Sequence, residues 1–292
     1  MSPLKLSLLL VAVSLSILPR AEARPFRAMV TRTTFTTGPQ NLELGLRYQG
    51  FYGGDGLNSL GYSQLTPGVR FGIVERLELN IQLDLMLIHQ RLPGPFGVYV
   101  GDLPIGLQFT FLNTPVFSLG VYGRLTIPVG ASLFQRLSVD LQDRIPPSLS
   151  DGTWDAEGTM IAEVRPTRNF TLMANVGYLL NGVRQNSGSG AFDVPDAILY
   201  NFAATLNVGE WVLLGVEMAG RSYFDRVITP VWTNNQHQIE VIPHARFEVV
   251  PNLVLEVALG IALTRDLGEI YRVRLLLGFT YEFDLLGRKR RS

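Results

Sequence analysis

The strongest constraint on the fold is an alternation of apolar and polar residues with a period of two, repeated along most of the chain. Between residues 77 and 87 every odd position is leucine or isoleucine, whereas Glu78, Asn80, Gln82 and Asp84 hold even positions. Successive side chains of a β-strand point to opposite faces, so this pattern predicts strands with one apolar and one polar face. Twelve segments follow it, at about 41–50, 63–73, 77–87, 102–111, 116–127, 158–165, 170–180, 197–206, 211–221, 237–249, 253–263 and 271–283.

The connections between these segments alternate in length. Short links lie at 74–76, 112–115, 166–169, 207–210 and 250–252, and longer ones at 51–62, 88–101, 128–157, 181–196, 222–236 and 264–270. Most segments are also long enough for a tilted strand to cross a bilayer. We therefore predict an all-β fold over residues 41–283. It is a single closed antiparallel transmembrane β-barrel of about twelve strands, with short periplasmic turns and longer extracellular loops.

The distribution of charge supports this register. Within the predicted strands the apolar face carries no charged residue, as expected of a surface in lipid, where a central Arg would cost roughly 2–4 kcal/mol. The polar face would line the lumen. Its candidate lining residues are Arg47, Arg70, Glu78, Asp84, Arg124, Glu163, Arg165, Glu217, Arg221, Glu240, His244, Arg246, Arg272 and Arg274. Two interpretations stay open: a packed, ion-paired interior, or a wet pore whose charges select solutes.

Aromatic residues of the apolar face fall into two groups, as in the aromatic belts of barrels. Near the long links are Tyr48, Tyr178, Tyr200 and Tyr271; near the short links are Phe71, Phe109, Phe111, Phe117, Phe170, Phe247, Phe279, Tyr281 and Phe283. A soluble all-β protein with its apolar face inward would show the same alternation. Strand length, aromatic belts and the alternating links favour the membrane.

The two ends of the chain lie outside the predicted barrel. Residues 1–23 resemble a secretory signal peptide, with Lys5, the apolar stretch 6–18 and an Ala21-Glu22-Ala23 cleavage site, although a retained anchor is an alternative. We expect a multi-pass protein of the bacterial outer membrane, with outer-membrane lipid and the assembly machinery as partners. Residues 24–40 are predicted to be an N-terminal extension or a plug, and residues 284–292 a basic tail.

Three short motifs resemble a known family. The stretch 72–79 (GIVERLEL) resembles a turn-and-strand motif of the meta-pathway phenol-degradation transporter family. The stretch 101–108 (GDLPIGLQ) resembles that family's Gly-Asp-Leu strand start, and 125–130 (LTIPVG) resembles its strand exit. The resemblance runs over most of residues 38–283. It implies an outer-membrane channel of about twelve strands with hydrophobic or aromatic cargo.

Other chemistry finds little support in the sequence. There is no cysteine, which excludes disulfides and thiol catalysis. The net charge is zero, so the sequence lacks the basic excess expected of a nucleic-acid-binding protein. A barrel hydrolase would need a His beside a nucleophilic Ser, and neither His-x-Ser nor Gly-x-Ser-x-Gly occurs. Asp151, Asp155 and Glu157 could offer oxygens to calcium, but an ordinary acidic loop explains them as well. We predict no enzyme, no cofactor and no metal.

The predicted function is passive diffusion of small molecules through a polar, charge-lined lumen. The alternatives are a structural or adhesion barrel with a plugged lumen and functional extracellular loops, or a barrel hydrolase that uses His244.

Overall fold

The computed structural model of the chain describes residues 31–34, 36–53, 61–89, 97–130, 153–182, 196–224, 237–264 and 271–285. The predicted signal peptide with its cleavage site, residues 24–30, most of the long links and residues 286–292 of the basic tail lie outside these ranges. No helix among the described residues is long and apolar enough to cross a membrane.

The strands are β1 (Asn41–Tyr52), β2 (Gly61–Val74), β3 (Leu77–Gln82), β4 (Leu85–His89), β5 (Gly97–Val100), β6 (Leu103–Asn113), β7 (Phe117–Ile127), β8 (Asp155–Val164), β9 (Phe170–Leu180), β10 (Ala197–Val208), β11 (Val212–Tyr223), β12 (His237–Val250), β13 (Leu253–Ala262) and β14 (Val273–Asp284).

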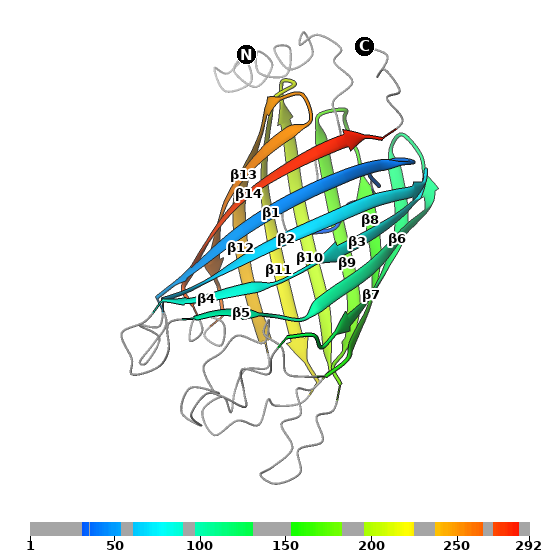
Figure 1. The fold of residues 1–292 in the computed structure, drawn as a ribbon. Helices are drawn as coiled ribbons and strands as arrows, with labels where there is room; N and C mark the ends of the chain where they lie inside the picture. Colours follow the sequence, from blue (N-terminus) through cyan, green and yellow to red (C-terminus); the bar gives the residue numbers. More distant parts are fainter. Residues whose placement is uncertain are drawn as a thin grey trace, which may run out of the picture.

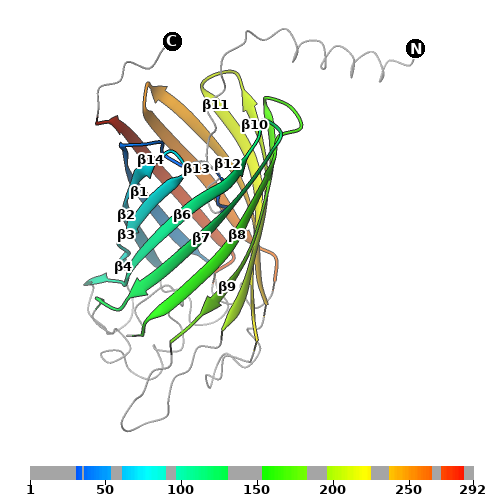
Figure 2. The same ribbon diagram turned by 90° about the vertical axis from the view of Figure 1, so that its right-hand side faces the viewer.

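These strands form one closed antiparallel wall (Figures 1 and 2). The sheet closes because β1 pairs with β14 along one edge and with β2 along the other. Two strands of the wall are each broken into two pieces, β3 with β4 and β5 with β6, so the fourteen pieces make twelve strands. The all-β closed antiparallel barrel of twelve strands is confirmed. Asn41 lies opposite Asp284, so the barrel begins and ends at the rim that carries the short turns.

A proline explains the break in the strand predicted at 77–87. The Leu83 amide donates to the Pro67 carbonyl oxygen at 3.0 Å. Because proline has no N–H, Pro67 cannot donate the second hydrogen bond of this antiparallel pair. The hydrogen-bond ladder is therefore interrupted at residues 83 and 84. The register is the same on both sides of the gap, so β3 and β4 are one strand with an interruption.

The next strand breaks for a different reason. Leu85 pairs with Val100, whereas Ile81 pairs with Ile105, so this strand carries one residue more than its neighbour. The extra residue forms a bulge at Gly101, whose amide donates to the Asp84 carbonyl at 2.6 Å. The prediction placed this strand at 102–111, and β5 lies in what was expected to be a link.

The exposed face of the wall is apolar and the buried face is largely polar. In β9, Leu172, Val176 and Leu180 are exposed on the outside, whereas Met173 and Asn175 are buried on the inside. This is the reverse of a soluble barrel, which buries its apolar face. Among the predicted belts, Phe109, Phe111, Phe247, Phe279, Tyr281 and Phe283 are exposed near the short turns, and Tyr178 is exposed near a long link.

Tyr271 departs from the predicted belt. Its side chain is buried, and its hydroxyl donates to the inward carboxylate of Glu240 at 3.0 Å. Tyr271 precedes β14, so strand alternation does not fix its direction, and it packs edge-on against the inward ring of Phe51. Burial raises the pKa of the Tyr271 phenol, which therefore stays protonated as a donor.

The rim with the short turns contains most of the irregular pairing. Register shifts occur at Gly72/Val74, Thr110/Leu112 and Glu248/Val250, each beside a short turn. In two of the turns Gly209 and Asn252 adopt positive φ, a conformation that Gly and Asn tolerate best. Bulges at a barrel rim bend the strands and end their pairing.

A pair of matched substitutions tests whether the exposed face lies in lipid. Val176 is at the middle of β9, and Val208 is at the end of β10 beside a short turn. In phospholipid vesicles, Val176→Arg should lower the free energy of unfolding by about 2–4 kcal/mol, and Val208→Arg by about 0–1 kcal/mol. Denaturant titration measures both values. Equal effects at the two positions would contradict a membrane-spanning wall.

Candidate functional site

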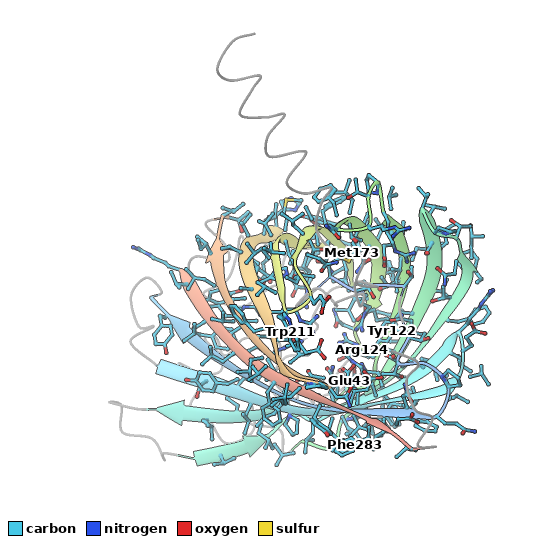
Figure 3. All side chains as sticks on the ribbon, turned by 90° about the horizontal axis from the view of Figure 1, so that it is seen from above. Glu43, Tyr122, Arg124, Met173, Trp211 and Phe283 are labelled. Carbon is cyan, nitrogen blue, oxygen red and sulfur yellow. The ribbon has the colours of Figure 1, made fainter. Side chains whose placement is uncertain are left out.

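The interior of the barrel is the candidate site, because the predicted charged residues meet there. Glu43, Tyr122 and Arg124 lie inside the ring of strands when the barrel is viewed along its length (Figure 3). Glu78, Glu163 and Glu217 also face inward, each no more than 2% exposed. Burying a carboxylate is costly unless neighbours pair with it. The contacts of these groups therefore decide what the interior can do.

Most inward arginines pair with a carboxylate of the wall. Three of these pairs join residues that lie directly opposite each other on neighbouring strands, where charged side chains meet most easily. They are Glu43–Arg70 at 2.7 Å, Arg124–Glu157 at 2.8 Å and Arg246–Glu256 at 2.5 Å. Arg165, the first residue after β8, pairs with Glu163 of that strand at 2.7 Å. The inner wall is thus partly neutralised by its own ion pairs.

One pair, Arg274 with Glu240, reaches across an intervening strand. Glu240 is on β12 and Arg274 on β14, with Gly260 of β13 between them. A Cβ atom at position 260 would lie 2.6 Å from a Glu240 carboxylate oxygen and 3.3 Å from two Arg274 side-chain atoms. Glycine at this inward position leaves the space in which the two charged groups meet. Arg274 also donates to the Gln49 side-chain oxygen at 2.9 Å.

His244 lies deep in the interior beside Glu217, with its Nδ1 atom 3.2 Å from a carboxylate oxygen. Both side chains are fully buried. A hydrolase would need a nucleophile here. Ser222 and His237 share a hydrogen bond elsewhere, at 2.9 Å on exposed strand ends. A Ser–His contact by itself provides no donors for an oxyanion, so it does not make a hydrolase.

The remaining predicted lining residues occupy varied places. Asp84 accepts a hydrogen bond from the Thr66 hydroxyl at 2.7 Å, at the break between β3 and β4. Arg221 donates to the Tyr223 hydroxyl at 3.1 Å. Arg272 is exposed and precedes β14, because that strand begins two residues later than predicted.

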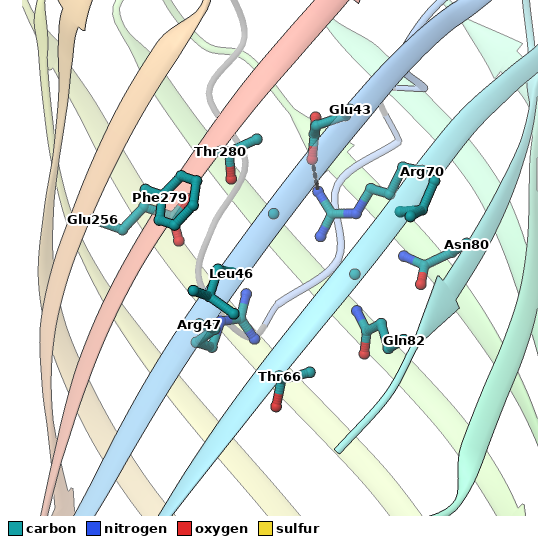
Figure 4. A pocket seen from close by; sticks show the side chains of 13 residues that line it. Glu43, Leu46, Arg47, Thr66, Arg70, Asn80, Gln82, Glu256, Phe279 and Thr280 are labelled. Atoms are coloured by element: carbon teal, nitrogen blue, oxygen red, sulfur yellow. Dashed lines mark hydrogen bonds and ion pairs between the residues drawn. The ribbon is translucent and has the colours of Figure 1, made fainter. Parts of the chain in front are cut away.

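Arg47 borders a pocket of the inner wall, shown in Figure 4. Water-sized molecules have about 40 Å³ of space there, between β13, β14, β1, β2 and β3. Gly45 and Gly68, which lie opposite each other on β1 and β2, line the pocket, and the Glu43–Arg70 pair lies at one end. The Arg47 Nε atom donates no hydrogen bond within the described part of the chain. The pocket is therefore a small charged recess of the inner wall with room for water, and it is too small to be a solute path by itself.

A segment of the chain itself runs through the interior ahead of β1. We call residues 31–37 the inner segment; residue 35 is not among the described residues. Its backbone amides donate to three wall carboxylates at intervals of three residues. The contacts are Thr31 to Glu217 at 2.6 Å, Thr34 to Glu163 at 3.1 Å and Thr37 to Glu78 at 2.8 Å. These carboxylates come from β11, β8 and β3, so the segment contacts widely separated strands.

Other wall groups bind the carbonyl oxygens and side chains of the inner segment. Gln108 donates to the Thr33 carbonyl at 2.8 Å, and the Thr110 hydroxyl donates to the Thr34 carbonyl. The Arg32 guanidinium carbon lies 3.3 Å from the centroid of the Tyr122 ring. The segment is therefore held on both sides of its backbone.

The chain leaves the interior at the rim with the short turns. The Thr36 hydroxyl donates to the Glu75 carbonyl at 2.8 Å, and the Gln40 amide donates to the Gly72 carbonyl at 2.7 Å. A Cβ atom at position 72 would lie 1.6 Å from the Gly38 carbonyl oxygen, so only glycine allows this close approach. β1 then begins at Asn41.

Sequence reasoning missed Glu157 and Tyr122. Glu157 was grouped with Asp151 and Asp155 in a loop, whereas β8 already begins at Asp155 and Glu157 faces inward. Asp155 instead accepts hydrogen bonds from Thr153 and from the Gly182 amide, and Asp151 lies outside the described residues. No group of three potential metal ligands occurs in the described ranges. The alternation of Asp155, Glu157 and Thr159 was the signal that could have extended the strand.

Comparison with known proteins shows the fold. No family model matches the chain, and no curated protein matches it. An outer-membrane channel of Pseudomonas putida F1 has a TM-score of 0.63 at 13% identity, covering 90% of this chain and 100% of that one. The NanC porin has a TM-score of 0.54 at 5% identity, covering 82% and 98%. The KdgM porin has a TM-score of 0.50 at 10% identity, covering 82% and 99%.

These three structures are channels or porins, and the chain is a twelve-strand barrel that resembles them. Identities this low show the shared architecture alone. The resemblance of three short motifs to the phenol-degradation transporter family stays a prediction.

The space around Gly260 gives a testable prediction. Gly260→Val should separate Glu240 from Arg274 and lower the free energy of unfolding by about 1–3 kcal/mol through overpacking. Gly158→Val is the matched control, because nothing lies within 4 Å of a Cβ atom at that outward position. Denaturant titration of both variants in the same lipid gives the comparison. A Gly260→Val barrel as stable as the control would show that the inner wall has spare room there.

Proposed function

We propose that the protein is an outer-membrane channel for small solutes whose lumen is occupied by the inner segment in the conformation described. The observation that carries the proposal is the way the interior is filled. A single segment of the chain, bound to wall carboxylates through its backbone amides, lies where a packed structural barrel would have interdigitated side chains. Without that segment the inner wall is a polar, partly charged tube.

Several features support a location in the bacterial outer membrane. The exposed apolar face of the wall matches the hydrocarbon layer, and the rim with the short turns matches the periplasmic side of outer-membrane barrels. The sequence at 1–23 supports export and cleavage after Ala23. Outer-membrane lipid and the assembly machinery are then the expected partners.

The way the inner segment is held favours a channel over a permanently closed barrel. Its contacts with the wall include hydrogen bonds to carboxylates, such as Thr31 to Glu217 and Thr37 to Glu78. Water can make equivalent hydrogen bonds to these carboxylates when the segment leaves.

The cargo is proposed from the resemblance alone. Residues 72–79, 101–108 and 125–130 resemble the phenol-degradation transporter family, which implies hydrophobic or aromatic compounds. Such solutes would pass by diffusion through the polar, charge-lined lumen.

Conductance in planar bilayers tests the proposal. The wild-type barrel should show small, infrequent openings, and a variant that lacks residues 31–37 should conduct several-fold more current in each open channel. The electrophoretic shift between heated and unheated samples provides the control that the variant barrel is folded. A folded deletion variant without conductance would contradict the proposal and favour the structural or adhesion barrel.

A further inference from the structure

The side chain of Arg32 occupies a slot between an aromatic ring and a carboxylate. Its guanidinium carbon lies 3.3 Å from the Tyr122 ring centroid, and its Nε atom lies 3.9 Å from a Glu157 oxygen. A cation over the face of an aromatic ring is attracted by the ring quadrupole, and more strongly where water is excluded. Tyr122 is 4% exposed, so this contact is largely shielded from water.

The slot is built by the wall and does not depend on the inner segment. The Tyr122 ring lies over Gly106, where a Cβ atom would come within 2.2 Å of its hydroxyl. Glu157 is held by Arg124 at 2.8 Å and by the Thr159 hydroxyl at 2.9 Å. Both faces of the slot therefore keep their positions when Arg32 is absent.

The slot selects a flat cation. Glu157 already pairs with Arg124, so the attraction for a further cation comes mainly from the ring. A guanidinium group stacks on an aromatic face and is less strongly hydrated than an ammonium group. A guanidinium should therefore enter this slot more readily than a primary ammonium of similar size.

Side chains of the wall around the slot also bind the backbone of the inner segment. Glu217 and Glu163 accept amide N–H groups on either side of Arg32, and Gln108 and Thr110 donate to the carbonyl oxygens that follow it. Two amide donors and two carbonyl acceptors of this segment thus find partners in wall side chains. This is the chemistry that recognises a peptide main chain.

We propose that this inner wall is a binding track for short, arginine-containing peptides, and that the inner segment occupies it as an internal competitor. The inference rests on the proposed function, because a channel gives such a peptide access to the lumen. The Arg32 slot fixes the register of the bound peptide. The wall carboxylates Glu217, Glu163 and Glu78 accept hydrogen bonds from the amide of every third residue of that peptide. Binding from solution is weak while the tethered segment is present, because the tether gives it a high effective concentration.

Fluorescence anisotropy on the full barrel lacking residues 31–37 tests the proposal in detergent. The probe is a labelled peptide with the sequence of residues 31–37, and its control carries glutamine in place of the arginine. The first peptide should bind at least tenfold more tightly than the control. In the same deletion background, Tyr122→Phe should keep this preference and Tyr122→Leu should remove it. Equal binding of the two peptides, or no binding to the folded barrel, would overturn the proposal.

Chemical rescue provides a test that needs no deletion. In the full chain, Arg32→Ala empties the slot, and calorimetry measures binding of ethylguanidinium with ethylammonium as the control. Saturable binding of ethylguanidinium to this variant, at least tenfold weaker for ethylammonium and absent in wild type, is expected. No preference between the two cations would contradict the slot.

These binding measurements do not require a membrane. A barrel that binds the peptide but does not conduct would contradict only the proposed channel. A barrel that conducts but does not distinguish the two peptides would contradict only the peptide track.

Discussion

Several charged side chains on the inner face of the barrel are buried, among them Glu78, Glu163 and Glu217, and burying a charge is costly unless a group of the wall or the inner segment pairs with it. Neighbouring strands supply many of these partners directly, as in Arg246–Glu256. Where the partner is two strands away, a glycine such as Gly260 leaves room for the contact. The pattern of small and charged residues on the inner face follows from this requirement.

The inner segment belongs to the same network. Glu78, Glu163 and Glu217 each accept a backbone N–H from it, although Glu163 also pairs with Arg165 and Glu217 lies beside His244. The segment thus completes the hydrogen bonding of the wall as well as filling its lumen. A segment bound through polar contacts can be exchanged for water or for a solute that offers equivalent donors, whereas a packed apolar core cannot.

The wall could be predicted from the sequence because its signal is local. Period-two alternation and turn spacing predicted about twelve strands, and the structure confirms twelve, with shifted ends, an interruption between β3 and β4, and a bulge that separates β5 from β6. The break opposite Pro67 was readable in principle, since proline removes one ladder bond. Tyr271 and Glu157 were misplaced because both lie at strand ends, where alternation stops deciding which face a residue takes.

The course of the inner segment could not be predicted in this way. Thr31 contacts Glu217, 186 positions away in the sequence, and Thr34 contacts Glu163, 129 positions away. Such long-range contacts produce no periodic sequence pattern near either residue. The sequence indicated only that residues 24–40 lie outside the barrel strands. Their binding partners follow from barrel closure, which brings β3, β8 and β11 around one lumen.

The most direct test of the account is to fasten the inner segment reversibly to the wall. The chain has no cysteine, so Thr34→Cys with Glu163→Cys introduces the only two thiols, at positions whose side chains are in contact. A short linker joined to both through disulfides should keep single-channel conductance low, and reduction should raise it several-fold in the same bilayer. Conductance that stays the same before and after reduction would contradict the claim that this segment closes the channel.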